Sequence, residues 1–328
     1  MDETTLISVV MPVFNAEPFV QEAVESVLAQ THNDLELIAV DDGSTDSSLG
    51  ILEGYAAHDE RMRVFGTEHQ GISRALNAGI DVARGRWIGR MDADDICLPH
   101  RFARQLVAAR EAPHVVLWGS FARGINRRGD RVHLIALGPT TEEEFLRLRR
   151  EQQNIFALHP TWLVRRDVLI EAGGYDSRFD GLEDFELLMR IADHGSVRII
   201  PEELLLYRLH PADTSTTHVV QQQQLVEFLS ARMRARRQGR DIDLDSYLAE
   251  RQQRPFLQRR MESLGNLGRV HYRNATLHAV EGHYWSAAAS AARAMILNPR
   301  HTVGRLTDRL AQTLRSSHSA NRPDKRSE

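Results

Sequence analysis

The chain has 328 residues, 42% of them hydrophobic, and a net charge of −4. This length suits two domains or one large domain with an appendage, and the charge gives no argument for nucleic-acid binding. The single cysteine, Cys97, excludes an internal disulfide and a cysteine-based zinc site. The N-terminus does not resemble a signal peptide, and no apolar run reaches the ~20 residues that span a bilayer. We therefore expect a cytoplasmic protein, or one attached peripherally to the inner face of the membrane.

Strand and helix patterns alternate over the first hundred residues. Strands are expected at 6–14, 35–40, 63–65 and 86–91, and helices at 17–30, from about 46, and at 72–83. This alternation predicts a parallel, doubly wound sheet, in which ligands bind beyond the carboxyl ends of the strands. Asn15, Asp42 and the segment 92–95 follow three of these strands, so we expect them to share one site.

The rest of the chain divides into two regions of different composition. Helices are expected at 99–110, 141–151 and 183–193, strands at 114–121, 196–200 and 203–208, and a hairpin or loop at 122–138. Beyond about residue 217 the sequence is polar, Arg-rich and helix-favouring. We predict one domain over 1–215, a helical region over 216–315 that includes one hairpin of tetratricopeptide type near 278–300, and a disordered tail over 316–328.

An acidic cluster, Asp92, Asp94 and Asp95, follows the apolar run at 87–91. Like charges this close are unfavourable unless a cation or a dense hydrogen-bond network compensates them. A hard divalent ion, Mg2+ or Mn2+, takes carboxylate and diphosphate oxygens as ligands. The cluster therefore predicts a metal that binds together with a nucleotide diphosphate, and the alternative is a solvated acidic turn.

Four motifs in order resemble the family 2 glycosyltransferases. They are Val9-Val10-Met11-Pro12-Val13-Phe14-Asn15, Asp41-Asp42-Gly43-Ser44-Thr45-Asp46, Asn77-Ala78-Gly79 and Met91-Asp92-Ala93-Asp94-Asp95. The resemblance covers residues 6 to about 215. It implies a GT-A fold, which is a Rossmann-like mixed α/β sheet flanked by helices, with a sugar-nucleotide donor, Mn2+ or Mg2+, and inversion at the anomeric carbon.

The resemblance also implies which residues bind the donor. Pro12, Phe14 and Asn15 would line the base pocket, although an ordinary core position is an equal alternative for Phe14. Asp42 would accept a hydrogen bond from the uracil N–H, and Asp41 would hold the turn. Arg74 would approach the diphosphate, and its alternative is a solvated helix arginine.

The metal and the catalytic base are assigned in the same way. Asp94 would be the main metal ligand, and Asp92 would face the ribose or the metal. His210 would ligate the metal or touch the diphosphate, and its alternative is a structural or solvated histidine. Asp184 occupies the base position, with Glu183 as its partner or as an acceptor ligand. The alternative for both acids is an interaction with the helix dipole.

The expected activity is transfer of a sugar from a nucleotide-diphosphate sugar, a UDP-sugar by family habit, to a glycan or lipid-linked acceptor of a bacterial surface polysaccharide. Two alternatives are a sugar-1-phosphate nucleotidyltransferase and a non-catalytic scaffold with the same fold. The nucleotidyltransferase would need a Gly- and Arg-rich phosphate loop, which the segment 12–15 does not provide. The absence of a Q-x-x-R-W motif argues against a processive synthase. The Arg-rich helices after residue 230 are expected to form a solvated surface or a homodimer interface, and the alternative is electrostatic contact with an anionic membrane.

Overall fold

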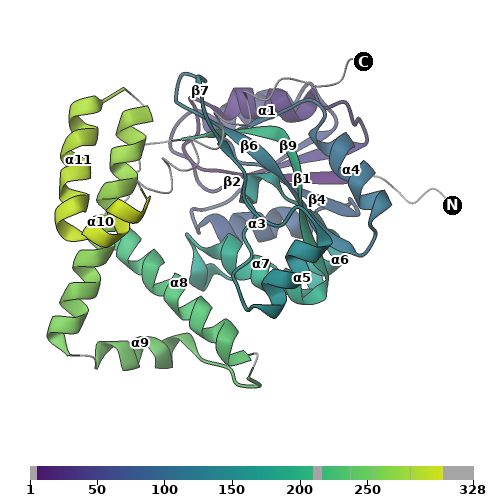
Figure 1. The fold of residues 1–328 in the computed structure, drawn as a ribbon. Helices are drawn as coiled ribbons and strands as arrows, with labels where there is room; N and C mark the ends of the chain where they lie inside the picture. The colour runs from purple at the N-terminus through teal and green to yellow at the C-terminus, as the bar shows by residue number, and fades with distance from the viewer. Residues whose placement is uncertain (1–5, 210–215, 237, 254, 281, 306–328) are drawn as a thin grey trace, which may run out of the picture. The chain divides into compact units, whose positions relative to one another are not determined.

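The computed structural model describes residues 6–209, 216–236, 238–253, 255–280 and 282–305. The chain divides into two compact units, one ending at Leu209 and one beginning at His210 (Figure 1). His210, the predicted boundary at 215/216 and the predicted tail at 316–328 lie outside the described residues.

The first unit contains one mixed sheet of nine strands. In chain order they are β1 (Ile7–Val13), β2 (Leu35–Asp41), β3 (Met62–Gly66), β4 (Trp87–Arg90), β5 (Ile96–Cys97), β6 (Val115–Ile125), β7 (Arg131–Ile135), β8 (Leu163–Arg165) and β9 (Ser196–Arg208). The order across the sheet is β3-β2-β1-β4-β8-β6-β9-β5, and β7 pairs with β6. Strands β1 to β4 are parallel, whereas β8 runs antiparallel to β4 and β6. The mixed sheet implied by the resemblance is confirmed, and the purely parallel sheet expected from the alternation alone is wrong.

Seven helices of the first unit cover both faces of this sheet (Figure 1). They are α1 (Val20–Leu28), α2 (Ser48–Ala56), α3 (Ile72–Asp81), α4 (Arg101–Glu111), α5 (Glu142–Arg150), α6 (Arg166–Glu171) and α7 (Glu183–His194). Side chains of α1, α2 and α4 pack on one face, and side chains of α3, α5, α6 and α7 pack on the other. The apolar side chains of β1 and β2 are thus buried on both faces of the sheet, as is typical of parallel strands covered by helices on both sides.

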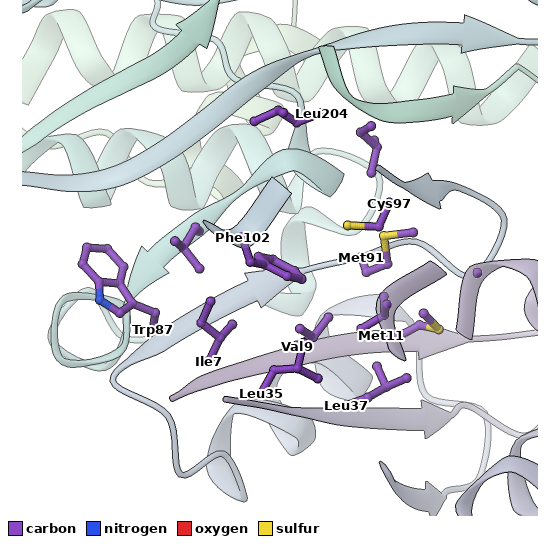
Figure 2. Close-up of a cluster of buried hydrophobic side chains, with 14 of the residues drawn as sticks. Ile7, Val9, Met11, Leu35, Leu37, Trp87, Met91, Cys97, Phe102 and Leu204 are labelled. Atoms are coloured by element: carbon purple, nitrogen blue, oxygen red, sulfur yellow. The ribbon is translucent and has the colours of Figure 1, made fainter. Parts of the chain in front are cut away.

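The first core forms where alternate residues of the central strands meet α1 and α4. Figure 2 shows Ile7, Val9 and Met11 of β1 in this cluster, with Phe102 of α4 beside them. On the opposite face Val10 packs against α3, where a Cβ on Gly79 would lie 2.5 Å from Val10 Cγ1. Because Gly79 has no Cβ, α3 can pack closely against β1. This packing holds the N-terminus of α3 near the carboxyl ends of β1 and β2.

The two short strands expected at 196–200 and 203–208 are one strand, β9. Pro201 has no N–H to donate to a ladder. Ser120 of β6 pairs with Ile200 and Phe121 pairs with Glu203, so β9 bulges at Pro201 and Glu202 and then continues as the same strand. Strands β5 and β8 were not predicted, because two or three residues carry no readable periodicity.

A buried carboxylate, Glu36, supports the amino ends of the strands, away from the acidic cluster. Its oxygens accept hydrogen bonds from Ser8 Oγ (2.6 Å), the Arg84 backbone N–H and guanidinium (2.7–3.0 Å) and Arg63 Nη1 (3.2 Å). Burial alone would raise the pKa of Glu36, but the hydrogen bonds from Arg84, Ser8 and Arg63 hold the pKa at about 2.

Glu36→Gln is expected to lower the free energy of unfolding by about 2–4 kcal/mol at pH 7, because it leaves buried donors with a neutral partner. The folded pKa lies below the ordinary 4.5, so the contribution of Glu36 is present above pH 4.5 and is lost as the pH falls toward 2. The difference between wild type and variant in urea unfolding should shrink over that window. Glu53→Gln, an exposed change in α2, is the control. A difference that is constant with pH would contradict this account.

The second unit is helical over its described residues. It contains α8 (Thr216–Arg236), α9 (Leu244–Gln252), α10 (Phe256–Val280) and α11 (Tyr284–Leu297). Helices α10 and α11 pack as a hairpin, and a Cβ on Gly268 would lie 2.5 Å from Asn298 Cβ. The hairpin predicted at 278–300 contains the turn and α11, but its first arm already begins at Phe256.

Candidate active site

Several predicted site residues lie beyond the carboxyl ends of β1, β2 and β4. Phe14 and Asn15 follow β1, Asp42 follows β2, and Asp92 is the second residue after β4. Because these three strands are neighbours and parallel, their ends meet at one edge of the sheet. The site is thus assembled from loops that the sheet holds in register.

Asp42 anchors the loop between β3 and α3. Its Oδ1 accepts the Gln70 N–H at 2.8 Å and its Oδ2 accepts the Gly71 N–H at 2.9 Å. His69 Nδ1 also lies 2.9 Å from Oδ2. The carboxylate therefore fixes this loop, and its predicted bond to a uracil N–H stays a prediction.

Phe14 and His69 form a stacked pair beside Asp42. Their ring centroids are 4.2 Å apart with an interplanar angle of 19°, and Phe14 is 47% exposed. The core alternative for Phe14 is excluded by this exposure. No local sequence pattern indicates His69, because its contacts with Phe14 and Asp42 join residues far apart in the sequence.

Asn15 ties the loop after β1 to the turn after β2. It has a left-handed φ of 50°, its Oδ1 accepts the Thr45 N–H at 2.8 Å, and its own N–H donates to Ser44 Oγ at 2.9 Å. Asp41 holds the same turn, since its Oδ2 accepts the Ser44 N–H at 3.0 Å. The turn-holding geometry predicted for Asp41 is therefore present, and Asn15 has the same structural task.

The other two predicted donor residues lie nearby. Pro12 is a half-buried residue of β1, opposite Val40 of β2. Arg74 is an exposed residue of α3 whose Nη1 donates to Gln70 Oε1 at 2.9 Å. Arg74 therefore contacts the loop that Asp42 anchors. The predicted contact of Arg74 with a diphosphate stays a prediction.

Asp92, Asp94 and Asp95 offer ligand atoms that all lie within 4.8 Å of one another. Asp92 pairs with the buried guanidinium of Arg90. Asp95 is buried, and its Oδ1 accepts the Arg208 N–H at 2.8 Å, whereas its Oδ2 has no hydrogen-bond partner among the described residues. Burial and repulsion from Asp92 and Asp94 raise the pKa of Asp95. An unpartnered buried oxygen within a ring of carboxylates fits a hard divalent cation such as Mg2+ or Mn2+.

Arg208 locks the end of β9 against this cluster. Its Nε donates to Asp94 O at 2.8 Å, and its Nη2 pairs with Glu22 of α1 at 2.7 Å. The guanidinium also lies over the Phe19 ring, 4.6 Å from the centroid. No local sequence pattern indicates this role, because the partners are up to 186 residues away. His210 lies outside the described residues, so its predicted metal contact stays a prediction.

The acids of α7 lie at its N-terminus. Glu183 is buried and its Oε2 accepts the Gly181 N–H at 2.6 Å. Burial and the charge of Asp184 raise the pKa of Glu183 to about 7. Asp184 Oδ1 accepts the Phe185 N–H at 2.6 Å, and burial raises its pKa. The charge of Asp184 in turn contributes to the raised pKa of Asp92, so the two acidic groups belong to one site.

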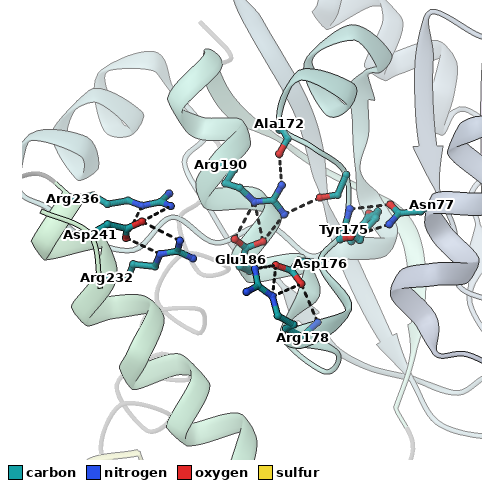
Figure 3. Close-up of polar contacts among 11 residues, drawn as sticks. Asn77, Ala172, Tyr175, Asp176, Arg178, Glu186, Arg190, Arg232, Arg236 and Asp241 are labelled. Atoms are coloured by element: carbon teal, nitrogen blue, oxygen red, sulfur yellow. Dashed lines mark hydrogen bonds and ion pairs between the residues drawn. The ribbon is translucent and has the colours of Figure 1, made fainter. Parts of the chain in front are cut away.

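The loop before α7 is braced by a hydrogen-bond network (Figure 3). Gly173 and Gly174 have φ values of 87° and 65°, which only glycine adopts at little cost. Arg190 of α7 pairs with Glu186 and donates to Ala172 O and to Gly174 O. From α3, Asn77 Oδ1 accepts the Tyr175 N–H at 2.9 Å and Asn77 Nδ2 donates to Tyr175 O at 2.8 Å. The motif residue Asn77 therefore positions the loop rather than a ligand.

Behind the acids, His159 Nε2 lies 2.7 Å from the Tyr175 hydroxyl. Burial and the charge of Arg90 lower the pKa of His159 well below its usual value, so the imidazole is neutral. Burial raises the pKa of Tyr175, and the Arg90 charge opposes that shift. Arg90, His159 and Tyr175 are all buried, and the charges of Glu183 and Asp184 contribute to the raised pKa of Tyr175.

Glu183→Gln is expected to stabilise the fold at pH 8 by up to about 3 kcal/mol. The folded pKa lies above the ordinary 4.5, so wild type loses stability as the pH rises from about 4.5 to 7, and the glutamine variant does not. Urea unfolding at pH 4 and pH 8 measures the difference. Glu143→Gln, an exposed first-turn acid of α5, is the matched control. If Glu183→Gln showed no gain at pH 8, the burial of a charged carboxylate at this position would be refuted.

Comparisons with known proteins agree with this geometry. Residues 8–173 match the family model described as glycosyl transferase family 2. The uncharacterized glycosyltransferase EpsJ of Bacillus subtilis (strain 168) is 32% identical over 213 residues, which are 63% of this chain and 62% of EpsJ. The O-antigen biosynthesis glycosyltransferase WbnJ of Escherichia coli is 30% identical, over 64% of this chain and 82% of WbnJ. The chain thus spans less than two thirds of EpsJ.

The fold has solved counterparts. The structure of S. aureus TarS 1–349 in complex with UDP-GlcNAc matches with a TM-score of 0.56 and 18% identity, over 91% of this chain and 92% of that one. This likeness confirms the GT-A fold of a mixed sheet flanked by helices. The family model covers half of the chain, and this half includes the carboxyl ends of β1, β2 and β4 at the site. This protein therefore belongs to glycosyl transferase family 2.

Proposed function

We propose that this chain is an inverting, metal-dependent glycosyltransferase. It would move a sugar from a UDP-sugar to a glycan or lipid-linked acceptor of a surface polysaccharide, on the cytoplasmic side of the membrane. The observation that carries the proposal is the cluster of Asp92, Asp94 and Asp95, whose ligand atoms lie within 4.8 Å of one another, beyond the strand ends that also hold Asp42 and the stacked pair of Phe14 and His69. The name of WbnJ and the UDP-GlcNAc in the TarS structure support the substrate class.

Asp94 and Asp92 would hold the metal, with Asp95 behind them. A bound Mn2+ or Mg2+ supplies positive charge for the leaving diphosphate, so no protonated general acid is required. Phe14 and His69 provide a stacked aromatic surface next to Asp42, at the position expected for the base. Arg74 would contribute its exposed guanidinium on the diphosphate side.

Asp184 would act as the base. Its carboxylate takes the proton of the acceptor hydroxyl as that oxygen bonds to the anomeric carbon, and the bond from this carbon to the diphosphate oxygen breaks on the opposite side. The helix behind Asp184 and the network around Arg190 hold the carboxylate in place. Glu183 would bind acceptor hydroxyls or support Asp184. No observation in the described residues favours the nucleotidyltransferase, and the retained acids give the scaffold no support.

Proton NMR of the transferred sugar tests the proposal. The protein is incubated with Mn2+, a panel of UDP-sugars and short glycan or polyprenyl-diphosphate acceptors. The product should carry the anomeric configuration opposite to that of the donor. Retention of configuration, or transfer that is unaffected by EDTA, would overturn the proposal.

Phe14→Ala is expected to weaken UDP binding about tenfold, because one stacking surface for the base is lost. Calorimetric titration of UDP with Mn2+ measures the change. Phe156→Ala is the matched control, since Phe156 is 46% exposed and stacks on Phe185 of α7, whereas Phe14 stacks on His69. An equal loss in both variants would contradict the base pocket at Phe14.

A further inference from the structure

Helix α11 turns its large apolar side chains outward. Trp285 is 91% exposed, Ile296 79% and Tyr284 74%. The residues of α11 that are buried against its neighbours are small, namely Ser290 and Ala294. An ordinary surface helix has the opposite arrangement, with large apolar residues inside and polar residues outside.

These outward residues lie on one side of the helix. At about 100° per residue they share an arc of about 120°. We call this surface the α11 face, and it consists of Tyr284, Trp285, Ala288, Ala292, Met295 and Ile296, all exposed. A continuous apolar face of this kind is typical of an interaction surface.

Positive charge predominates in the hairpin that carries the α11 face. Residues 256–305 contain seven arginines and two glutamates, although the whole chain has a net charge of −4. Arg269, Arg293, Arg300 and Arg305 are exposed and form no ion pair within the part of the chain that the structure describes. Burial and the charges of Arg269 and Arg305 lower the pKa of His301, and burial and the charge of Arg293 lower the pKa of His271. These arginines therefore lie on the same hairpin as the α11 face.

Charge complementarity distinguishes the two candidate partners of this face, which are a second copy of the chain and an anionic lipid bilayer. A second copy of the chain would bring the same unpaired arginines against one another. An anionic bilayer surface would supply phosphates for the arginines and an interfacial environment that tryptophan and tyrosine prefer. In the described residues no helix combines the length and the apolar character needed to cross a membrane, so α11 would lie along the surface.

We propose that the α11 face is a membrane-contact surface that seats this chain on an anionic lipid bilayer. Trp285 and Ile296 enter the boundary between headgroups and acyl chains, and the arginines pair with lipid phosphates. The proposal concerns the second unit and does not depend on the transfer reaction.

Vesicle binding by the full chain tests it. Phosphatidylcholine vesicles with added phosphatidylglycerol should sediment the protein, less so as salt is raised, whereas phosphatidylcholine alone should not. Tryptophan fluorescence identifies the contact, because Trp87, Trp118 and Trp162 are buried and Trp285 alone of the four is exposed. Its emission should shift to shorter wavelength on binding to anionic vesicles.

The double variant Trp285→Ala with Ile296→Ala should bind anionic vesicles about tenfold more weakly or not at all. Arg293→Gln and Arg300→Gln should each weaken binding about fivefold. The matched control is Val107→Ala with Ile170→Ala, two exposed apolar residues of the first unit, which should bind as wild type does. Circular dichroism verifies that each variant is folded.

Three results would overturn the proposal: no binding to anionic vesicles, equal binding by the double variant, or equal binding to neutral vesicles. Sedimentation equilibrium supplies a fourth. A wild-type dimer that the double variant converts to a monomer would assign the face to a second copy instead.

Discussion

Asp184→Asn is expected to lower kcat about 10²–10⁴-fold, because the amide cannot take the proton of the acceptor hydroxyl. The amide oxygen can still accept the Phe185 N–H that Asp184 Oδ1 accepts at 2.6 Å, so the start of α7 should stay in place. The affinity for UDP and metal should therefore change little. Steady-state transfer assays and UDP titration measure the two quantities separately.

Asp193→Asn is the matched control for this change. It alters an aspartate at the other end of α7, which pairs with Arg149 and is half exposed. Its kcat should equal that of wild type. A full kcat in Asp184→Asn would remove Asp184 from the reaction and make Glu183 the remaining candidate base, while a parallel loss of UDP affinity would indicate a structural role for Asp184.

Asp94→Asn is expected to weaken Mn2+-dependent UDP binding about 100-fold or more and to reduce transfer accordingly, because one anionic ligand is lost from the cluster. The fold should not suffer, since the change also removes repulsion from Asp92 and Asp95. The melting temperature should be equal to or higher than that of wild type. This combination separates loss of a ligand from loss of structure.

Asp81→Asn, an exposed change at the end of α3, is the control for the metal site. It should bind UDP and Mn2+ as wild type does. Undiminished binding by Asp94→Asn, with wild-type metal dependence, would show that the acidic cluster is a solvated turn and not a metal site.

Much of the site could be predicted from the sequence, because its residues are attached to strands with strong local signals. The run at 6–14 is apolar except for Ser8, so β1 and the position of Asn15 at its end follow from local pattern alone. The same holds for Asp42 after β2 and for Asp92 after β4. Parallel neighbours then bring these ends together, as the structure shows.

The remaining contributors could not be predicted, since long-range contacts define them. His69 gains its place from the Phe14 ring, which lies far from it in the sequence. Arg208 is separated from its partners Asp95 and Glu22 by 113 and 186 residues. The direction of β8 could not be predicted either, because three residues are too few to show a strand or its orientation.

Calorimetric titration of UDP, GDP and dTDP into the purified protein, with Mn2+ and again with EDTA, tests the central claim most directly. The claim predicts that UDP binds in the presence of Mn2+, that EDTA abolishes or strongly weakens this binding, and that GDP and dTDP bind more weakly. Metal-dependent binding of GDP or dTDP in place of UDP would keep the site and change the donor. If folded protein bound none of the three nucleotides, the donor site itself would be refuted.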